Sequence, residues 1–156
     1  MDKAKLFRNA CGKFATGVTI ITHKTDNEVH GMTANGFMSV SLNPELVIIS
    51  VGKKQRMHAL LMDGKEFGVS ILSESQENLS NHFAGKPDDN LNIQFDHIGG
   101  AAKIAGAIAY FIAEIKSRYD EGDHTLFVGR VTDFGVTKED EKPLLFYSGK
   151  YKNISE

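Results

Sequence analysis

Two stretches of the chain carry side chains that could hold a flat, phosphate-bearing molecule. The first runs from His30 to Val51 and contains the small polar run Thr33-Ala34-Asn35 ahead of a β-branched segment. A basic turn, Lys53-Lys54-Gln55-Arg56, comes directly after it. Small residues allow a ligand to approach the backbone closely, and cations beside a helix start suit an anion. The pattern predicts a pocket for a planar ring that carries a phosphate, and a merely solvated basic turn is the alternative.

The second stretch is Gly122-Asp123-His124-Thr125, at the mouth of a predicted hairpin. Histidine titrates near neutrality and can stack on, or hydrogen-bond to, an aromatic cofactor. Asp123 is placed to orient the His124 ring. The alternative is a turn histidine whose ring is satisfied by its neighbours.

Several other kinds of site find no support in the sequence. No G-x-G-x-x-G or G-x-x-x-x-G-K-[ST] motif is present, so a nicotinamide cofactor would not be held by a Rossmann unit. The chain has no G-x-S-x-G nucleophile elbow. Its six histidines lack H-x-x-x-H and H-E-x-x-H spacing, and we therefore expect no metal site.

The elements that must position these residues are mostly strands. Asp2 can cap a first helix whose apolar face includes Cys11, a residue expected in the core. Short helices are predicted before Gly64 and, after a capping box at Ser73-Gln76, before Gly85. The polar stretch 86–90 is expected to be a mobile loop of the kind that covers a site. Strands are predicted at 18–22, 28–34, 46–51, 67–72, 107–119, 125–136 and, last, 144–147. Many strands and few helices indicate a mainly β protein, a β-barrel with helices at its edge.

Composition narrows the class of protein. The 156 residues are 41% hydrophobic and 24% charged, which fits a single domain, 1–156, with a real core. The formal net charge of -2 gives no field that would attract nucleic acid or an anionic membrane. The lone Cys11 excludes a disulfide within one chain, and neither a signal peptide nor a membrane-spanning run is visible. We expect a cytoplasmic protein.

Four segments together resemble the short-chain flavin reductases, which supply reduced flavin to two-component monooxygenases. They are Phe7-Arg8 with Phe14-Ala15-Thr16-Gly17-Val18-Thr19-Ile20, then 31–44, then Gly122-Asp123-His124-Thr125-Leu126-Phe127-Val128-Gly129, and finally 143–147 with Gly149 and Tyr151. Their order and spacing extend from about residue 7 to residue 151. The resemblance implies an FMN-binding split β-barrel that works as a homodimer with the flavin near the subunit interface. It also implies hydride transfer from NADH or NADPH to FMN, with FAD as the alternative flavin and a monooxygenase as a partner.

The resemblance also implies roles for single residues, and in two places this chain departs from the family. His124 matches the family's histidine beside the nicotinamide and the flavin. Gly36 stands where the family often has serine, and Lys54, Gln55 and Met57 replace hydroxyl residues, which leaves the phosphate contacts open. The cofactor-binding residues implied by position are Thr33, Ala34, Asn35, Ser50, Val51, Gly52, Lys53, Lys54, Gln55, Arg56, Phe83, Ala84 and, as a border of the ring, Tyr147.

Three other functions remain open at this point. A relative of pyridoxamine-phosphate oxidase would use a similar barrel, although the Gly122-Asp123-His124 segment argues against it. A flavin-binding electron carrier would need no nicotinamide partner. A plain structural or interaction domain would bind no flavin.

Overall fold

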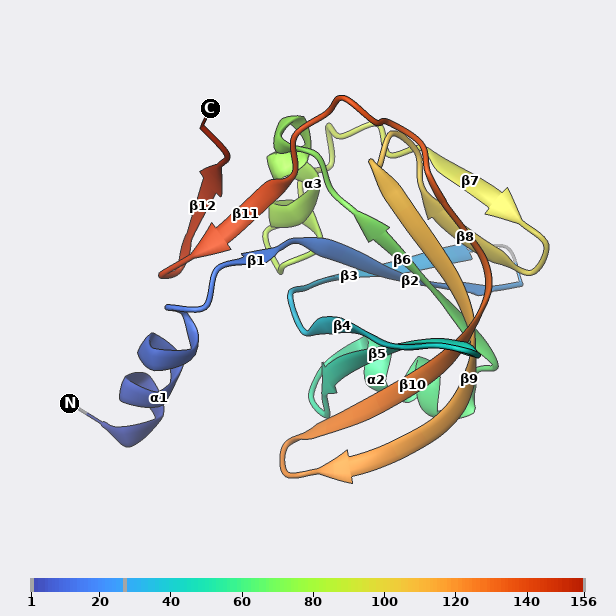
Figure 1. Cartoon of the computed structure of the whole chain (residues 1–156), viewed down its shortest axis with the longest axis horizontal. Coiled ribbons are helices and arrows are strands. Elements are labelled where there is room, and N and C mark those ends of the chain that lie inside the picture. Colours follow the sequence, from blue (N-terminus) through green and yellow to red (C-terminus); the bar gives the residue numbers. More distant parts are fainter. Residues whose placement is uncertain (1, 27, 156) are drawn as a thin grey trace.

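The computed structural model describes residues 2–26 and 28–155 (Figure 1). Most described residues lie in strands, which confirms the mainly β prediction. The helices are α1 (Lys3–Cys11), α2 (Arg56–Asp63) and α3 (Glu77–His82), the last preceded by the 3₁₀ turn η1 (Glu74–Gln76). The strands are β1 (Thr16–Gly17), β2 (Thr19–Thr25), β3 (Glu28–Ala34), β4 (Phe37–Leu42), β5 (Glu45–Gly52), β6 (Glu66–Ile71), β7 (Phe95–Ile98), β8 (Ala101–Ile104), β9 (Ala109–Glu121), β10 (His124–Val136), β11 (Leu144–Tyr147) and β12 (Lys150–Asn153).

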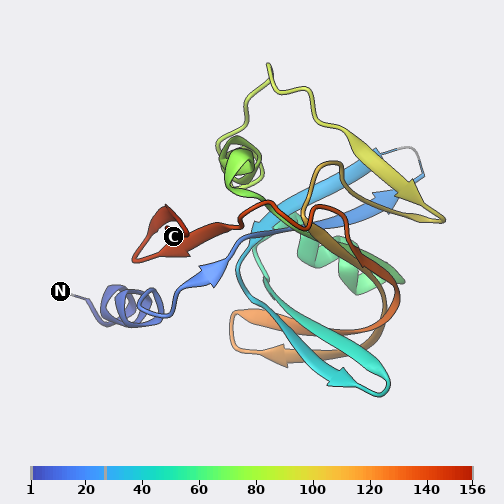
Figure 2. The same ribbon diagram turned by 45° about the horizontal axis from the view of Figure 1, so that its top comes forward.

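Seven strands form one antiparallel sheet in the order β3-β2-β6-β9-β10-β5-β4. The sheet curls into a barrel-like shape, so that its two edge strands, β3 and β4, come back toward each other (Figures 1 and 2). Among the described residues, strand pairing runs from β3 round to β4 and does not close between them. This open ladder is consistent with the expected split barrel. The uncoupled edges are joined covalently by Asn35-Gly36, which lies on the rim of the barrel.

The main core lies inside the curled sheet and under α2. Strand β5 alternates strictly, with Val47, Ile49 and Val51 buried and the residues between them partly exposed. Phe67 and Phe127 are fully buried in the same cluster. Helix α2 adds Met57 and Leu61, which are also buried, so packing holds this helix against the barrel. A second cluster, of Val18, Ile20, Leu72, Ile104, Ala107 and Leu144, joins the barrel to the two small sheets β7-β8 and β1-β11-β12.

Most of the predicted elements are confirmed. The long strand over 107–119 is β9, and its hairpin partner is β10. The Asp2 cap is present, since its Oδ1 accepts a hydrogen bond of 2.8 Å from the Lys5 amide. Both halves of the capping box at Ser73 and Gln76 form. Asn27, in the predicted turn between β2 and β3, lies outside the described residues.

Helix α1 contradicts one prediction. The helix lies beyond β1 at one end of the molecule (Figure 2), and against the described residues none of its side chains is buried. The prediction that Cys11 is a core residue is therefore wrong, because Cys11 is exposed. Phe7 and Phe14 are 70% and 80% exposed. An amphipathic helix with an uncovered apolar face is a surface on which another chain can pack.

Two smaller differences concern the ends of the chain and the polar loop. The strand 144–147 is not the last, because β12 pairs with it as a hairpin. The stretch 86–90 is exposed between α3 and β7, and its mobility stays a prediction. Across 2–26 and 28–155, none of the helices has the length and apolar character that crossing a membrane requires.

Candidate active site

A groove of about 620 Å³ opens on the rim of the barrel, and we call it the rim groove. Three segments line it: the end of β3 with the link to β4, the end of β5 with the basic turn, and the start of β10. Nine of the predicted site residues come together in it. The lining residues are Met32, Thr33, Ala34, Asn35, Gly36, Ser50, Gly52, Lys53, Lys54, Gln55, Asp123 and His124.

Strand pairing explains why these distant segments meet. Strands β5 and β10 are antiparallel neighbours, with Gly52 opposite His124 and Ser50 opposite Leu126. The Ser50 amide donates a 2.9 Å hydrogen bond to the Gly36 carbonyl, which draws the β3–β4 link against β5. A Cβ atom on Gly36 would stand 3.2 Å from the Cβ of Ser50. Glycine therefore suits this close approach, at the position where the family often has serine.

His124 stands at the edge of the rim groove and is oriented by its neighbour. Its Nδ1 atom lies 2.8 Å from Oδ1 of Asp123, and its side chain is 49% exposed. When Nδ1 carries a proton it donates to the carboxylate, which leaves Nε2 directed away from Asp123. The hydrogen bond from His124 is the main cause that lowers the pKa of Asp123 below its ordinary 3.8. This hydrogen bond supports the predicted role of Asp123 in orienting the His124 ring.

Gly52 faces the His124 ring across the pairing of β5 with β10. A Cβ atom on Gly52 would lie 3.6 Å from the Nε2 atom of His124, an ordinary contact distance. Gly52 itself leaves that space open. The imidazole therefore lies beside the backbone of Gly52 at the groove's edge.

The basic turn approaches the groove from the other side. Lys53 is held by the β9–β10 hairpin, because its Nζ atom pairs with Asp120 and its amide donates to the Asp123 carbonyl at 2.9 Å. Lys54 and Gln55 are exposed and line the groove. Gln55 is the N-cap of α2, and its side chain makes no capping hydrogen bond. The amides of the first helical turn and the Lys54 ammonium together suit an anion.

Five predicted residues do not line the rim groove. The Val51 side chain is fully buried in the core. Arg56 lines a separate cavity of about 390 Å³ behind α2, with His23 among its neighbours. The remaining three lie on the α3 and β11 side of the molecule: Phe83 against Gly31, Ala84 in a small cavity of about 170 Å³ with Thr33, Ala34 and Asn35, and Tyr147 beside Lys13.

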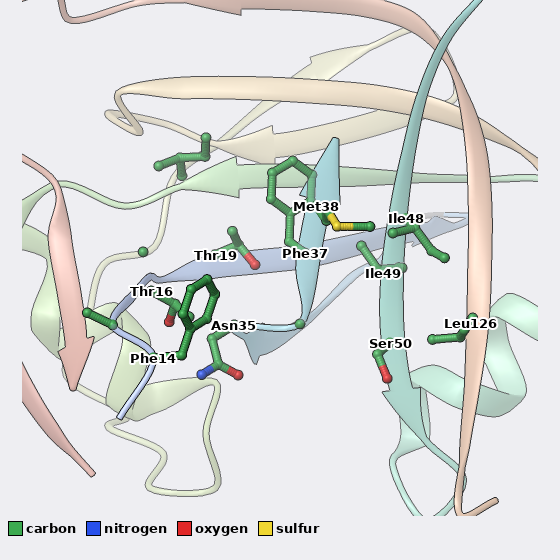
Figure 3. A pocket seen from close by; sticks show the side chains of 14 residues that line it. Phe14, Thr16, Thr19, Asn35, Phe37, Met38, Ile48, Ile49, Ser50 and Leu126 are labelled. Carbon is green, nitrogen blue, oxygen red and sulfur yellow. The ribbon is translucent and has the colours of Figure 1, made fainter. Parts of the chain in front are cut away.

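A second cavity, of about 540 Å³, adjoins the rim groove and is mainly apolar (Figure 3). The two share Asn35, Gly36 and Ser50 as a common wall. In Figure 3 the Phe14 ring lies beside Asn35, and Leu126 reaches in from β10. Sequence reasoning gave Phe14 and Leu126 no site role, although both stand in segments that carry the resemblance. Thr16 also lines this cavity, and its buried Oγ1 has no hydrogen-bond partner among the described residues.

The chemistry available in the rim groove is that of positioning. Residues 33–36 offer a wall of small side chains on which a planar ring can lie, and the basic turn offers positive charge at one end. His124 adds a polar ring at the edge. In the described part of the chain, no three His, Cys, Asp or Glu side chains are grouped so that they could hold a metal ion.

Comparison with known proteins identifies the family of the chain. The profile of the flavin reductase like domain matches residues 11–155. The NADH-dependent flavin reductase StyB of Pseudomonas fluorescens is 41% identical over 148 residues, which cover 93% of this chain and 86% of that one. The reductase component of 4-hydroxyphenylacetate 3-monooxygenase from Thermus thermophilus is 33% identical over 148 residues, which cover 95% of each chain. The solved structure of the flavin reductase PheA2 in its native state superposes with a TM-score of 0.94 and 48% identity over the whole of both chains. The predicted resemblance is confirmed, and the chain belongs to the flavin reductase-like family.

Proposed function

We propose that this protein is an NAD(P)H-dependent flavin reductase and that the rim groove is its flavin site. One observation carries the proposal: the oriented His124 stands at the edge of the groove that the small wall 33–36 and the basic turn also line. A flat ring, an anionic tail and a nicotinamide each find a matching surface within that one groove. Family membership and the names of the relatives point the same way.

The groove fits a flavin on the evidence of its own residues. Thr33, Ala34 and Asn35 would hold the ring and ribityl chain, because their small side chains leave the backbone accessible. Ser50 and Gly52 would meet the ring edge. Lys54, with Gln55 and the first turn of α2, would hold the phosphate.

The flavin supplies the chemistry, because its N5 atom accepts a hydride from C4 of reduced nicotinamide. The chain's own contribution is orientation, which lowers the entropic part of the barrier. His124, held by Asp123, would contact the nicotinamide and fix its face toward the flavin ring. No side chain has to donate or remove a proton in that step. We prefer NADH as the reductant, since StyB is described as NADH-dependent.

An anaerobic absorbance titration tests the function. The purified protein is titrated with FMN and then FAD, and each complex receives NADH or NADPH without air. Saturable binding followed by rapid bleaching of the flavin supports a reductase and identifies both the flavin and the nucleotide. Binding without bleaching would leave an electron carrier or an oxidase, and a colourless protein would leave a structural domain.

We also propose a homodimer of single-domain chains, in agreement with the resemblance. The support is exposed apolar side chains in two places: Phe7 and Phe14, in and just after α1, are 70% and 80% exposed, and Leu42 at the end of β4 is 89% exposed. Light scattering at micromolar concentration should give twice the 17.2 kDa of one chain, and Phe7→Ser with Leu42→Ser should return it to one.

We propose that the acceptor of the reduced flavin is a monooxygenase component, as for the relative from Thermus thermophilus. We propose a cytoplasmic location, because the exposed thiol of Cys11 suits a reducing compartment.

A further inference from the structure

His58 makes a contact that the proposed function does not yet use. It lies in the first turn of α2, three residues after Gln55, and is half-buried. Its Nε2 atom is 2.7 Å from Oγ1 of Thr125, which is 3% exposed. Its ring also meets Phe127 edge-on, with the ring centroids 6.1 Å apart. A short polar bond at a buried hydroxyl is costly to break, since the partner left behind is out of reach of water.

The position of Thr125 in the chain links this bond to the candidate site. Thr125 follows His124 directly, and the two side chains point to opposite faces of β10. The basic turn is thus hydrogen-bonded to consecutive residues at the start of β10. At its start, Gly52 pairs with His124 and the Lys53 amide bonds to the Asp123 carbonyl. Just after its end, His58 bonds to Thr125.

The bond from His58 to Thr125 differs from the apolar packing that holds the middle of α2. Helix α2 belongs to no strand ladder, and its buried residues Met57 and Leu61 hold it by apolar packing, which has no preferred direction. Directional bonds from Arg118 of β9 hold only its C-terminal end, at the Leu61 and Gly64 carbonyls. The bond from His58 to Thr125 is directional and works over a narrow range of distance. It is therefore suited to fix where the first turn of α2 stands along β10.

We propose that His58 is a positioning residue that sets the anion-binding turn, residues 53–55 with the start of α2, at a fixed distance from His124. The inference rests on the proposed function, because the turn is assigned there to the flavin phosphate. Loss of the bond from His58 to Thr125 should weaken binding of the flavin phosphate and leave binding of the flavin ring unchanged. His58 acts through the turn and makes no contact with the flavin itself.

Comparing FMN with riboflavin, which lacks the phosphate, isolates this effect. Dissociation constants for both are measured by fluorescence quenching on wild type, His58→Leu and Thr125→Val. We expect FMN to bind about threefold to tenfold more weakly to each variant, the range for one lost hydrogen bond, while riboflavin binding stays within about twofold. The double variant should lose no more than either single one, because both remove the same bond.

Two further variants separate positioning from general damage. His58→Gln keeps an amide N–H at a reach similar to that of Nε2 and should restore most of the preference for FMN. His97→Leu removes an exposed histidine of β7 and should leave both constants unchanged. The expected steady-state result for His58→Leu is a higher KM for FMN with kcat retained at saturation.

The possible results distinguish failure of the positioning role from failure of the groove assignment. Equal weakening of FMN and riboflavin, or an undiminished FMN preference in both His58→Leu and Thr125→Val, overturns the positioning role. Failure of the wild-type protein to bind either flavin, or a wild-type protein with no preference for FMN, overturns the assignment of the groove instead. The wild-type measurement is therefore made first.

Discussion

The ring of Phe83 lies directly on the backbone of Gly31, so that a Cβ atom at residue 31 would stand 2.7 Å from Cε1 of that ring. The contact joins α3 to β3 just ahead of the small wall of the rim groove. Two bonds continue it: the Thr33 amide donates to the Phe83 carbonyl at 3.2 Å, and the Thr33 hydroxyl donates to the Ser80 carbonyl at 2.6 Å. Thr33 is thus held from behind by α3.

Replacing Gly31 by alanine should therefore destabilise the fold. The added methyl group has to displace Phe83, and overpacking of this kind costs about 1–3 kcal/mol. Denaturant unfolding should show a lower midpoint with an unchanged slope. Gly17→Ala is the matched control, because nothing lies within 4 Å of a Cβ at that position. Equal midpoints for the two variants would mean that Phe83 adapts freely.

His124→Ala should impair the use of nicotinamide more than the binding of flavin. The imidazole lies at the groove's edge, so its loss removes a contact to the second ring and leaves the wall 33–36 intact. A rise of about tenfold in KM for NADH is expected, the value of about one good hydrogen bond. Steady-state kinetics beside a flavin titration measure the two effects separately. An unchanged turnover number together with an unchanged KM for NADH would remove His124 from the mechanism.

Lys54→Ala should weaken FMN binding about threefold to tenfold at low salt, as expected for one lost charge contact to phosphate. The loss should shrink as salt is added, because ions screen exposed charges. Lys53→Ala is the comparison, and its effect should be smaller, since Asp120 already pairs with the Lys53 ammonium. If Lys53→Ala proves the more damaging change, the two lysines have exchanged roles.

Tyr110 gives a prediction about pH and stability. Burial raises the pKa of Tyr110 above its ordinary 10.0, and the hydrogen bond of 3.0 Å from its hydroxyl to Asp133 adds to the rise. A raised pKa favours the neutral phenol, so its stabilisation is complete below pH 10 and is lost as the pH rises through the folded value.

Tyr110→Phe should therefore cost about 1 kcal/mol of unfolding free energy at neutral pH, the usual worth of such a bond. The difference from wild type should be constant from about pH 6 to pH 9 and should shrink above pH 10. Urea unfolding across that range measures it. A difference that grows with pH would contradict the assignment of the phenol as the donor.

The strands and the rim groove were accessible from sequence for a physical reason. Alternation in β5, glycine before β9 and the Asp120–Asp123 turn are local signals, and antiparallel pairing then brings Gly52 beside His124. Local sequence does not determine which cavity a surface side chain will line, because that depends on how the elements pack together. Arg56 continues the basic run in sequence, yet the first turn of α2 carries it to the cavity behind the helix.

The error at Cys11 has a different origin. Its helical spacing predicts an apolar face correctly, but sequence periodicity does not say whether the surface that covers such a face belongs to the same chain. The short strand β12, with Lys150, Lys152 and Asn153 in four residues, is too polar to register as a strand. It forms because β11 offers it an antiparallel partner.

The open seam between β3 and β4 has a mechanical consequence. In the described residues no ladder bond crosses it, and Asn35, at the bend, lines both the rim groove and the apolar cavity. Separating the two edges at this link would break no strand-ladder hydrogen bond among the described residues. For a reductase that releases its reduced flavin after each turnover, the seam is the place where the rim groove would widen at the least cost in strand pairing.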